Sequence, residues 1–133
     1  MSSTPILVTG GTGHLGANLV RRLLDEGHAV RALVRPGRNN GAFDGLALDV
    51  IEGDLRDPEA VRLAVSGCQK IYHCAAHVST ILGDAAHRRE VFDTNVIGTM
   101  NLLNAARDAG VEKVVVSGSL SATGYEKDVP TDE

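Results

Sequence analysis

The stretch ILVTGGTGHLG, residues 6–16, decides the fold of this chain. It is preceded by Pro5, and its first part is short, apolar and rich in β-branched residues, which predicts a buried strand at about residues 5–9. Glycines then follow at every third position, Gly10, Gly13 and Gly16, and apolar residues repeat at helical spacing after them. The sequence therefore predicts a strand, a glycine turn and a helix in direct succession.

Each glycine of this turn has its own expected role at a dinucleotide site. The first allows a sharp turn, the second leaves the backbone open to a pyrophosphate, and the third lets helix and strand pack closely. The first amides of a helix lack intrahelical partners and lie at the positive end of its dipole, so an anion binds there without a basic side chain. A glycine-rich turn can also be a plain corner of the chain, so the flanking sequence has to support the site.

The flanking sequence extends this unit into a regular α/β pattern. Gly27 marks a helix end, and an apolar run restarts at Ala29, which gives the length of a βαβ unit. Alternation of strands and helices is typical of a parallel sheet with helices on both faces. We expect a Rossmann-type, doubly wound parallel sheet in three layers, α/β/α, with strand order 3-2-1-4-5. The further strands are expected at about 29–34, 48–52, 70–74 and 113–117, and the helices at about 14–26, 58–66 and 85–109.

Three local features refine this expected fold. Asp57 followed by Pro58 is a good helix start, because the carboxylate caps free amides and proline needs no donor there. Gly98 costs about 1 kcal/mol of helix propensity relative to alanine, so close packing has to compensate. The apolar strand around Val115 would lie at an open sheet edge, an aggregation liability that complete folds cover. The side chains expected to face the sheet from the long helix are Val91, Val96, Thr99, Leu102, Leu103 and Ala106.

Composition sets the outer bounds on function. The chain has 133 residues, 43% of them hydrophobic, which suffices for one domain core. Its net charge of −4 argues against a non-specific nucleic acid partner. The amino terminus shows no signal architecture and no run could span a bilayer, so we expect no membrane partner and a cytoplasmic location. Cys68 and Cys74 show no motif spacing and are expected to be reduced.

The chain resembles the extended short-chain dehydrogenase/reductases, the NAD(P)-dependent epimerase/dehydratase family, and within it the dihydroflavonol-4-reductase-like branch. The matching stretches come in the family's order and cover almost the whole chain. The resemblance implies hydride transfer between a nicotinamide cofactor and a small-molecule carbonyl or nucleotide-sugar substrate, and homodimers are common among such relatives. The stretches are TGGTGHLG at 9–16, VRALVR at 30–35, EGDLRDPE at 52–59, YHCAAHVS at 72–79, TNVIGTMNLLNAA at 94–106 and VVVSGS at 114–119.

The resemblance also implies a set of cofactor-binding residues. Asp54 would contact the adenine amino group, with Leu55 packed on the ring. Small side chains at Ala75 and Ala76 would let the backbone approach the ribose and diphosphate, and Ser117 would line the nicotinamide pocket. The complete set comprises Gly10, Thr12, Gly13, His14, Leu15, Gly16, Arg35, Asp54, Leu55, Ala75, Ala76 and Ser117.

The end of the second expected strand bears on the choice of cofactor. An acidic residue there would accept hydrogen bonds from the adenosine ribose, but this sequence has Val34 followed by Arg35. An arginine fork suits a ribose phosphate, so NADP(H) is favoured over NAD(H), and Arg38 could assist. The alternative is that Arg35 only begins a solvated loop.

Two residues match the family's catalytic positions. Asn95 corresponds to an asparagine that supports a water and lysine relay, and Ser119 to the serine or threonine that holds the substrate carbonyl. From the residues alone, a mid-helix asparagine is usually just tolerated or faces solvent, and a serine-rich turn is the preferred interpretation of Ser119. His73 and His77 are not expected to bind a metal, because their spacing suits one face of a helix, whereas this segment leaves a strand.

The family's general acid is the tyrosine of a YxxxK pair, which is expected beyond Glu133. Tyr125 is not a substitute, because its fourth following residue is Val129. We therefore expect residues 1–133 to form the NAD(P)-binding Rossmann domain without the substrate-binding part. The whole protein is expected to be a reductase, epimerase or dehydratase, with a ketone or aldehyde reductase favoured. The alternative is a non-catalytic dinucleotide sensor resembling the NmrA-like proteins.

Overall fold

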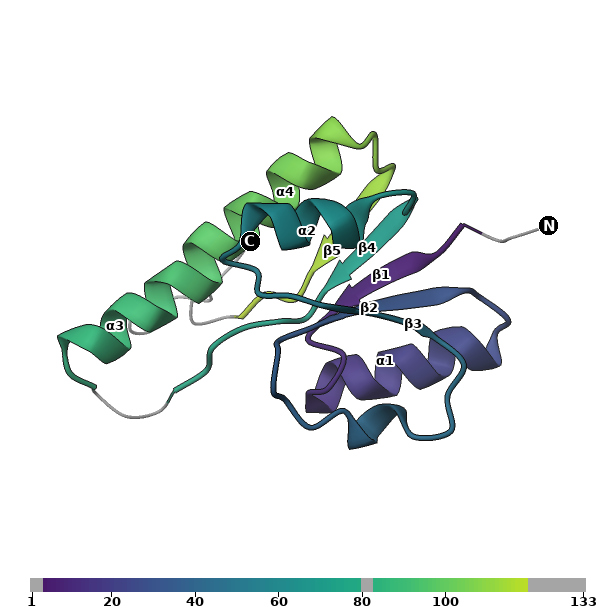
Figure 1. The fold of residues 1–133 in the computed structure, drawn as a ribbon, viewed down its shortest axis with the longest axis horizontal. Helices are drawn as coiled ribbons and strands as arrows, with labels where there is room; N and C mark the ends of the chain where they lie inside the picture. The colour runs from purple at the N-terminus through teal and green to yellow at the C-terminus, as the bar shows by residue number, and fades with distance from the viewer. Residues whose placement is uncertain (1–3, 80–82, 120–133) are drawn as a thin grey trace, which may run out of the picture.

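The computed structural model describes residues 4–79 and 83–119. Its five parallel strands form one sheet in the order β3-β2-β1-β4-β5 (Figure 1). This order confirms the Rossmann-type prediction. The strands are β1 (Ile6–Thr9), β2 (Val30–Val34), β3 (Asp49–Glu52), β4 (Lys70–His73) and β5 (Lys113–Val116).

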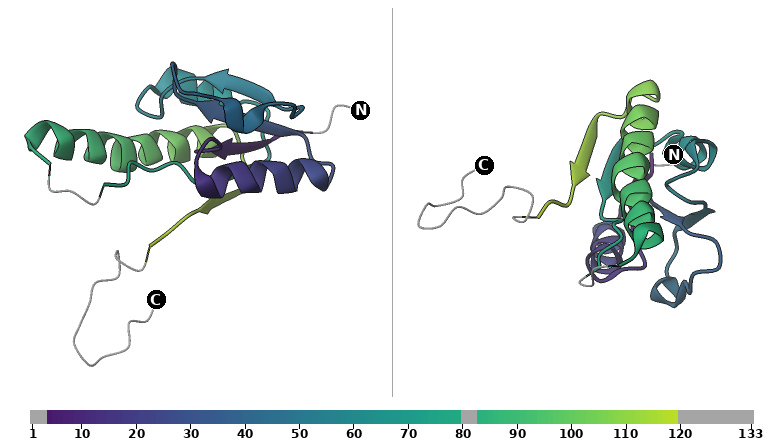
Figure 2. Two further views of the ribbon diagram at one scale, coloured as in Figure 1. Left: turned by 90° about the horizontal axis from the view of Figure 1, so that it is seen from below. Right: turned by 90° about the vertical axis from the view of Figure 1, so that its left-hand side faces the viewer.

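Helices cover both faces of the sheet. Figure 1 shows α1 on one side and α2 and α4 on the other. The segment from α3 to α4 is continuous and contains a π-helical turn, η2; it runs as one rod that extends beyond the sheet (Figure 2). No helix in the described part of the chain has the length and apolar character needed to cross a membrane. The helices are α1 (His14–Asp25), α2 (Pro58–Val65), α3 (Ala85–Phe92), η2 (Asp93–Ile97) and α4 (Gly98–Asp108), with a short 3₁₀ helix, η1 (Gly41–Phe43), after β2.

Two hydrophobic cores lie on the two faces of the sheet. Successive strand residues point to opposite faces, so Ile6 and Val8 pack toward α1 while Leu7 packs toward α2 and α4. Leu7, Val8 and Ile71 are completely buried. Burial on both faces explains why the strands read as continuous apolar runs rather than as alternating patterns.

The expected open edge of the sheet is present at β5. This strand pairs with β4 on one side and is the last strand of the described sheet. Val115 and Val116 are 41% and 49% exposed. An apolar edge strand of this kind can pair with other chains.

The face of the long helical segment differs from the prediction at two positions. Val96 and Leu103, expected to face the sheet, are 41% and 44% exposed. Gly98 lies against the sheet side, and at about 100° per residue both side chains point roughly 140–160° away from it. The residues that this segment buries are Thr94, Gly98, Leu102, Ala105 and Ala106.

Local contacts confirm the helix start at Asp57. Its carboxylate accepts a hydrogen bond from the Glu59 amide at 3.0 Å, and Pro58 is the first helical residue. A polar side chain therefore closes the amino end of α2, as Asp followed by Pro predicts.

A charged side chain also holds the other end of α2. Arg31 Nη1 donates to the carbonyls of Ala64 and Ser66 at 3.0 and 2.6 Å. Its Nε donates to Asp49 Oδ2 at 2.6 Å, and only 18% of the arginine side chain is exposed. One residue of β2 thus joins β3 to carbonyls that the end of a helix leaves without partners.

Candidate functional site

The glycine turn between β1 and α1 has no space for a side chain at Gly10 or Gly16. Gly10 adopts a φ of 71°, and a Cβ there would lie 2.6 Å from the Ala75 amide nitrogen. A Cβ at Gly16 would meet the Gly10 backbone, with 2.7 Å to its carbonyl carbon. Both positions therefore require glycine: Gly10 because of its conformation and the closeness of the segment that follows β4, and Gly16 because of its contact with the turn itself.

The amino end of α1 presents backbone donors rather than a side-chain cap. Gly13 is the N-cap residue and no side chain caps the helix. A Cβ at Gly13 would have a single near contact, 3.3 Å from the Gly10 carbonyl oxygen. The uncapped first-turn amides and the helix dipole make this end suitable for an anion.

A pocket of about 340 Å³ lies beside this turn, at the carboxyl ends of the strands. Open α/β sheets bind ligands in this position. Of the predicted cofactor-binding residues, the pocket is lined by Gly10, Thr12, Gly13, Arg35, Asp54, Leu55, Ala75 and Ala76. Arg38, predicted to assist Arg35, also lines it, and the lining residues that the prediction did not include as cofactor-binding are Leu33, Val34, Cys74, His77, Val78 and Thr94.

The other predicted site residues lie elsewhere. His14 is exposed, Leu15 is 57% exposed, and Gly16 packs beneath the turn. Ser117 donates to the His73 carbonyl through its amide at 3.0 Å and its hydroxyl at 3.2 Å. Ser119 is exposed, beyond the end of β5. Tyr125 lies outside the described residues.

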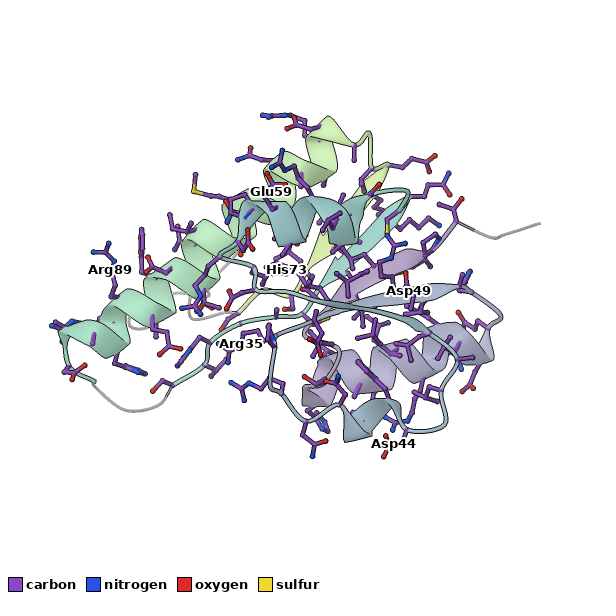
Figure 3. The ribbon with its side chains drawn as sticks, in the orientation of Figure 1. Arg35, Asp44, Asp49, Glu59, His73 and Arg89 are labelled. Carbon is purple, nitrogen blue, oxygen red and sulfur yellow. The ribbon has the colours of Figure 1, made fainter. Side chains whose placement is uncertain are left out.

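A tight turn places two arginines on one rim of the pocket. The Arg38 amide donates to the Arg35 carbonyl at 3.2 Å, and Gly37 between them has a φ of 73°, as this type of turn requires. Figure 3 shows Arg35 between the sheet and α3. Its Nη1 lies 3.9 Å from Glu90 Oε1, whereas Arg38 has no carboxylate within 4 Å in the described part of the chain.

Asp54, on the same pocket, is held by Arg56. The Arg56 amide and Nε both donate to Asp54 Oδ1 at 2.9 Å, and Nη2 donates to Oδ2 at 2.7 Å. These hydrogen bonds lower the pKa of Asp54, so the group is a carboxylate at neutral pH. A carboxylate has about four acceptor positions, so one remains for a ligand donor.

Leu55 forms a wall of the pocket that is supported from behind. It is 7% exposed, and a Cβ at Gly98 would lie 2.9 Å from its own Cβ. Asn101 Nδ2 donates to the Leu55 carbonyl at 2.9 Å. The expected close packing at Gly98 is thus confirmed, and its partner is a pocket residue.

A buried histidine joins β1, β4 and α4 behind the pocket. His73, labelled in Figure 3, is 3% exposed. Its Nδ1 lies 2.6 Å from Thr9 Oγ1 and its Nε2 lies 2.9 Å from Thr99 Oγ1. Thr99 donates its own proton to the Asn95 carbonyl at 2.7 Å, so it accepts from His73 Nε2–H. Nδ1 then accepts from Thr9. Burial lowers the pKa of His73, which agrees with a neutral ring.

Thr94 is a pocket residue that the sequence prediction missed. It is 9% exposed, and its hydroxyl oxygen is buried without a hydrogen-bond partner among the described residues. A buried hydroxyl without a partner costs free energy, and a bound ligand would supply one. The signal for it in the sequence was its position four residues before Gly98, on the same helix face.

Asn95 does not line the pocket. Its side-chain amide is bonded to the backbone of His77, in the segment that follows β4. The pocket has the groups that a dinucleotide requires. Its diphosphate, ribose and base fit uncapped amides, two arginines, an ionised aspartate, apolar walls and a hydroxyl without a partner among the described residues.

Comparisons with known proteins agree with this geometry. The model of the NAD dependent epimerase/dehydratase family matches residues 6–133. The sterol demethylase protein B of Methylococcus capsulatus is 52% identical over 89% of this chain and 35% of its own length. A putative dihydroflavonol 4-reductase of Synechocystis is 43% identical over 91% of this chain and 34% of its own length. The chain therefore spans about a third of the length of these curated relatives.

A solved structure is similar in fold over almost the whole chain. It is the Bordetella bronchiseptica enzyme WbmG in complex with NAD and UDP. The TM-score is 0.79 at 29% identity, and the match covers 98% of this chain and 44% of that one.

Proposed function

The chain belongs to the NAD dependent epimerase/dehydratase family, and on that premise we propose that it is the coenzyme-binding part of an NAD(P)-dependent reductase. The observation that carries this proposal is the glycine turn that opens, through the uncapped start of α1, onto the pocket. The substrate class we favour is a ketone or aldehyde, because a relative carries the name of a dihydroflavonol reductase. A nucleotide sugar is the alternative, since WbmG was solved with UDP.

Different residues of the pocket bind different parts of the proposed coenzyme. The backbone from Gly10 to Gly16 holds the diphosphate, with donors from the first turn of α1. Leu55 packs against the adenine ring, and the remaining acceptor position of Asp54 accepts a hydrogen bond from the adenine amino group. The Thr94 hydroxyl, which has no other partner in the described structure, bonds to a ribose or diphosphate oxygen.

The rim at Arg35 favours NADP(H) over NAD(H) in this proposal. Val34 offers no carboxylate to the ribose hydroxyls, and Arg35 and Arg38 both line the pocket. A guanidinium binds a phosphate through parallel hydrogen bonds, which a ribose hydroxyl cannot reproduce.

The bound coenzyme supplies or accepts a hydride at its nicotinamide ring. In the whole protein, we assign Ser119 to holding the substrate carbonyl and Asn95 to supporting the active site. Ser117 lies at the end of β5, where the nicotinamide would reach. Proton transfer falls to a tyrosine of a YxxxK pair, a role that Tyr125 does not fit.

Thermal unfolding in the presence of coenzyme tests the binding proposal. A ligand that binds only the folded chain raises its unfolding temperature by mass action. We expect NADPH to raise it more than NADH at equal concentration. Equal shifts would count against Arg35 and Arg38 as phosphate ligands, and no shift with either would overturn the site. Turnover of carbonyl compounds by the whole protein separates the reductase from a non-catalytic dinucleotide sensor.

A further inference from the structure

Glu90 of α3 reaches across to two residues that line the pocket. Its Oε1 lies 3.9 Å from Arg35 Nη1 and 3.6 Å from His77 Nδ1. Arg35 follows β2, whereas His77 follows β4, so the carboxylate sits where the two loops approach each other. Glu90 does not itself line the pocket. It is 43% exposed, on a helix that buries none of its residues.

The other charged groups near Arg35 are already engaged or are cationic. Asp54 takes three hydrogen bonds from Arg56 and lies too far from Arg35 for an ion pair within 4 Å. Arg38 shares the turn with Arg35 and carries the same sign of charge. Glu90 is therefore the carboxylate that, in the described structure, pairs with Arg35.

We propose that Glu90 is a specificity-determining residue, which competes with the 2′-phosphate of the coenzyme for Arg35. This inference rests on the proposed function, in which Arg35 faces the adenosine ribose. Glu90 reduces the preference for the phosphorylated coenzyme below that which two unpaired arginines would give. The pocket consequently accepts both NADPH and NADH, with a moderate preference for the former.

The geometry favours competition over rigid support. At 3.9 Å the pair is longer than a hydrogen bond, and the side chains are 33% and 43% exposed. Exposed ion pairs of this kind are weak, so a phosphate can displace the carboxylate. The displaced carboxylate remains on α3 near two negative charges of the phosphate and repels them. An unphosphorylated ribose meets no such repulsion.

The experiment compares two fragments of the coenzymes, 2′-phospho-ADP-ribose and ADP-ribose. Their affinities for the full chain and for Glu90→Gln are measured by titration calorimetry. We expect the substitution to raise the affinity ratio in favour of the phosphorylated fragment by about two- to fivefold, the range for exposed pairs. The affinity for ADP-ribose stays within about 1.5-fold, because its ribose carries no charge.

Two further variants isolate the effect. Asp108→Asn removes the same charge at the far end of α4, where Asp108 pairs with Arg107, and should leave the ratio unchanged. In an Arg35→Ala background, Glu90→Gln should also have no effect, because the group for which it competes is gone.

The outcomes separate this inference from the function on which it rests. If both fragments bind but the ratio is unchanged in Glu90→Gln, Glu90 does not compete and the inference is wrong. A ratio that falls means that Glu90 orients Arg35 toward the phosphate, which also overturns it. If neither fragment binds the unsubstituted chain, the dinucleotide site itself is wrong and the inference fails with it.

Discussion

The side chain of Asn95 is bonded to both polar groups of the His77 backbone. Its Oδ1 accepts from the His77 amide at 2.7 Å, and its Nδ2 donates to the His77 carbonyl at 3.0 Å. One amide of the helical segment thereby fixes the loop that follows β4 and lines the pocket. This contact gives Asn95 a positioning role, while its part in a catalytic relay stays a prediction.

Replacement of Asn95 by alanine should weaken both the fold and coenzyme binding. The His77 amide and carbonyl would lose partners in a half-buried place, which costs about 1–3 kcal/mol of unfolding free energy. Urea unfolding measures this loss, and a smaller thermal shift with NADPH measures the effect on the loop. Asn95→Asp keeps the acceptor and loses the donor, so its stability should lie between those of the unsubstituted chain and Asn95→Ala. An alanine variant with unchanged stability and shift would contradict the positioning role.

His73 should make the stability depend on pH. Burial lowers its pKa below the ordinary value of about 6.5. The unfolded chain then binds more protons between the two pKa values, so stability is lost as the pH falls below about 6.5. The loss is at most about 1.4 kcal/mol for each pH unit, over the width of the shift.

A variant without the titrating group isolates this effect. His73→Gln keeps the other four histidines, so the difference between its urea-unfolding profile and that of the unsubstituted chain reports His73 alone. The stability advantage of the unsubstituted chain should shrink as the pH drops from 7 to 5. A constant difference across this range would show that the ring does not gain its proton on unfolding.

Alanine at two glycines of the turn should separate folding from binding. At Gly16 the methyl group would press on the backbone of Gly10, 2.7 Å from its carbonyl carbon, so we expect a loss of about 1–3 kcal/mol. At Gly13 the nearest contact is 3.3 Å, so the fold should persist while the methyl group enters the pocket lining. Circular dichroism and NADPH titration distinguish the two. Normal binding by Gly13→Ala would refute the diphosphate position.

Arg31 should contribute to stability alone. Its replacement by alanine removes a donor from the Ser66 carbonyl and leaves the Ala64 carbonyl only the weak Cys68 thiol donor at 3.4 Å, which costs about 1–3 kcal/mol. Arg31 does not line the pocket, so the relative effect of NADPH over NADH should be unchanged. Arg31→Lys keeps the charge but loses the planar fork of donors, so its unfolding free energy in urea should lie between those of the unsubstituted chain and Arg31→Ala. A changed coenzyme preference would show that this end of α2 is coupled to the pocket.

The fold could be predicted because its determinants are local. A buried strand, a turn without space for side chains and an amphipathic helix lie within one stretch, and Gly10 and Gly16 confirm the reason for glycine. The face that the long helical segment buries could be predicted less well from the sequence. Val96 and Leu103 are apolar, yet the helical segment packs inward with the side on which Gly98 meets Leu55, and these two large side chains lie on the opposite, exposed side.

The site could be predicted only as far as the backbone determines it. Segments that follow parallel strands meet at one edge, so Arg35, Asp54 and Ala75 come together as expected. Pairs of side chains from distant segments carry no pattern in a single sequence, which is why the link from Glu90 to Arg35 was missed. The pair of Asp54 and Arg56 is a different case, because these residues are only two positions apart in the sequence.

The width of the pocket at Leu55 depends on Gly98, a residue that does not line the pocket. Leu55 has little room to move away from the pocket, because a Cβ at Gly98 would already lie 2.9 Å from the Leu55 Cβ. A methyl group at Gly98 would push Leu55 into the pocket and narrow it, although residue 98 itself would not contact a bound ligand. If the proposed function holds, variation at Gly98, which does not line the pocket, would therefore change the thickness of the base that the pocket admits.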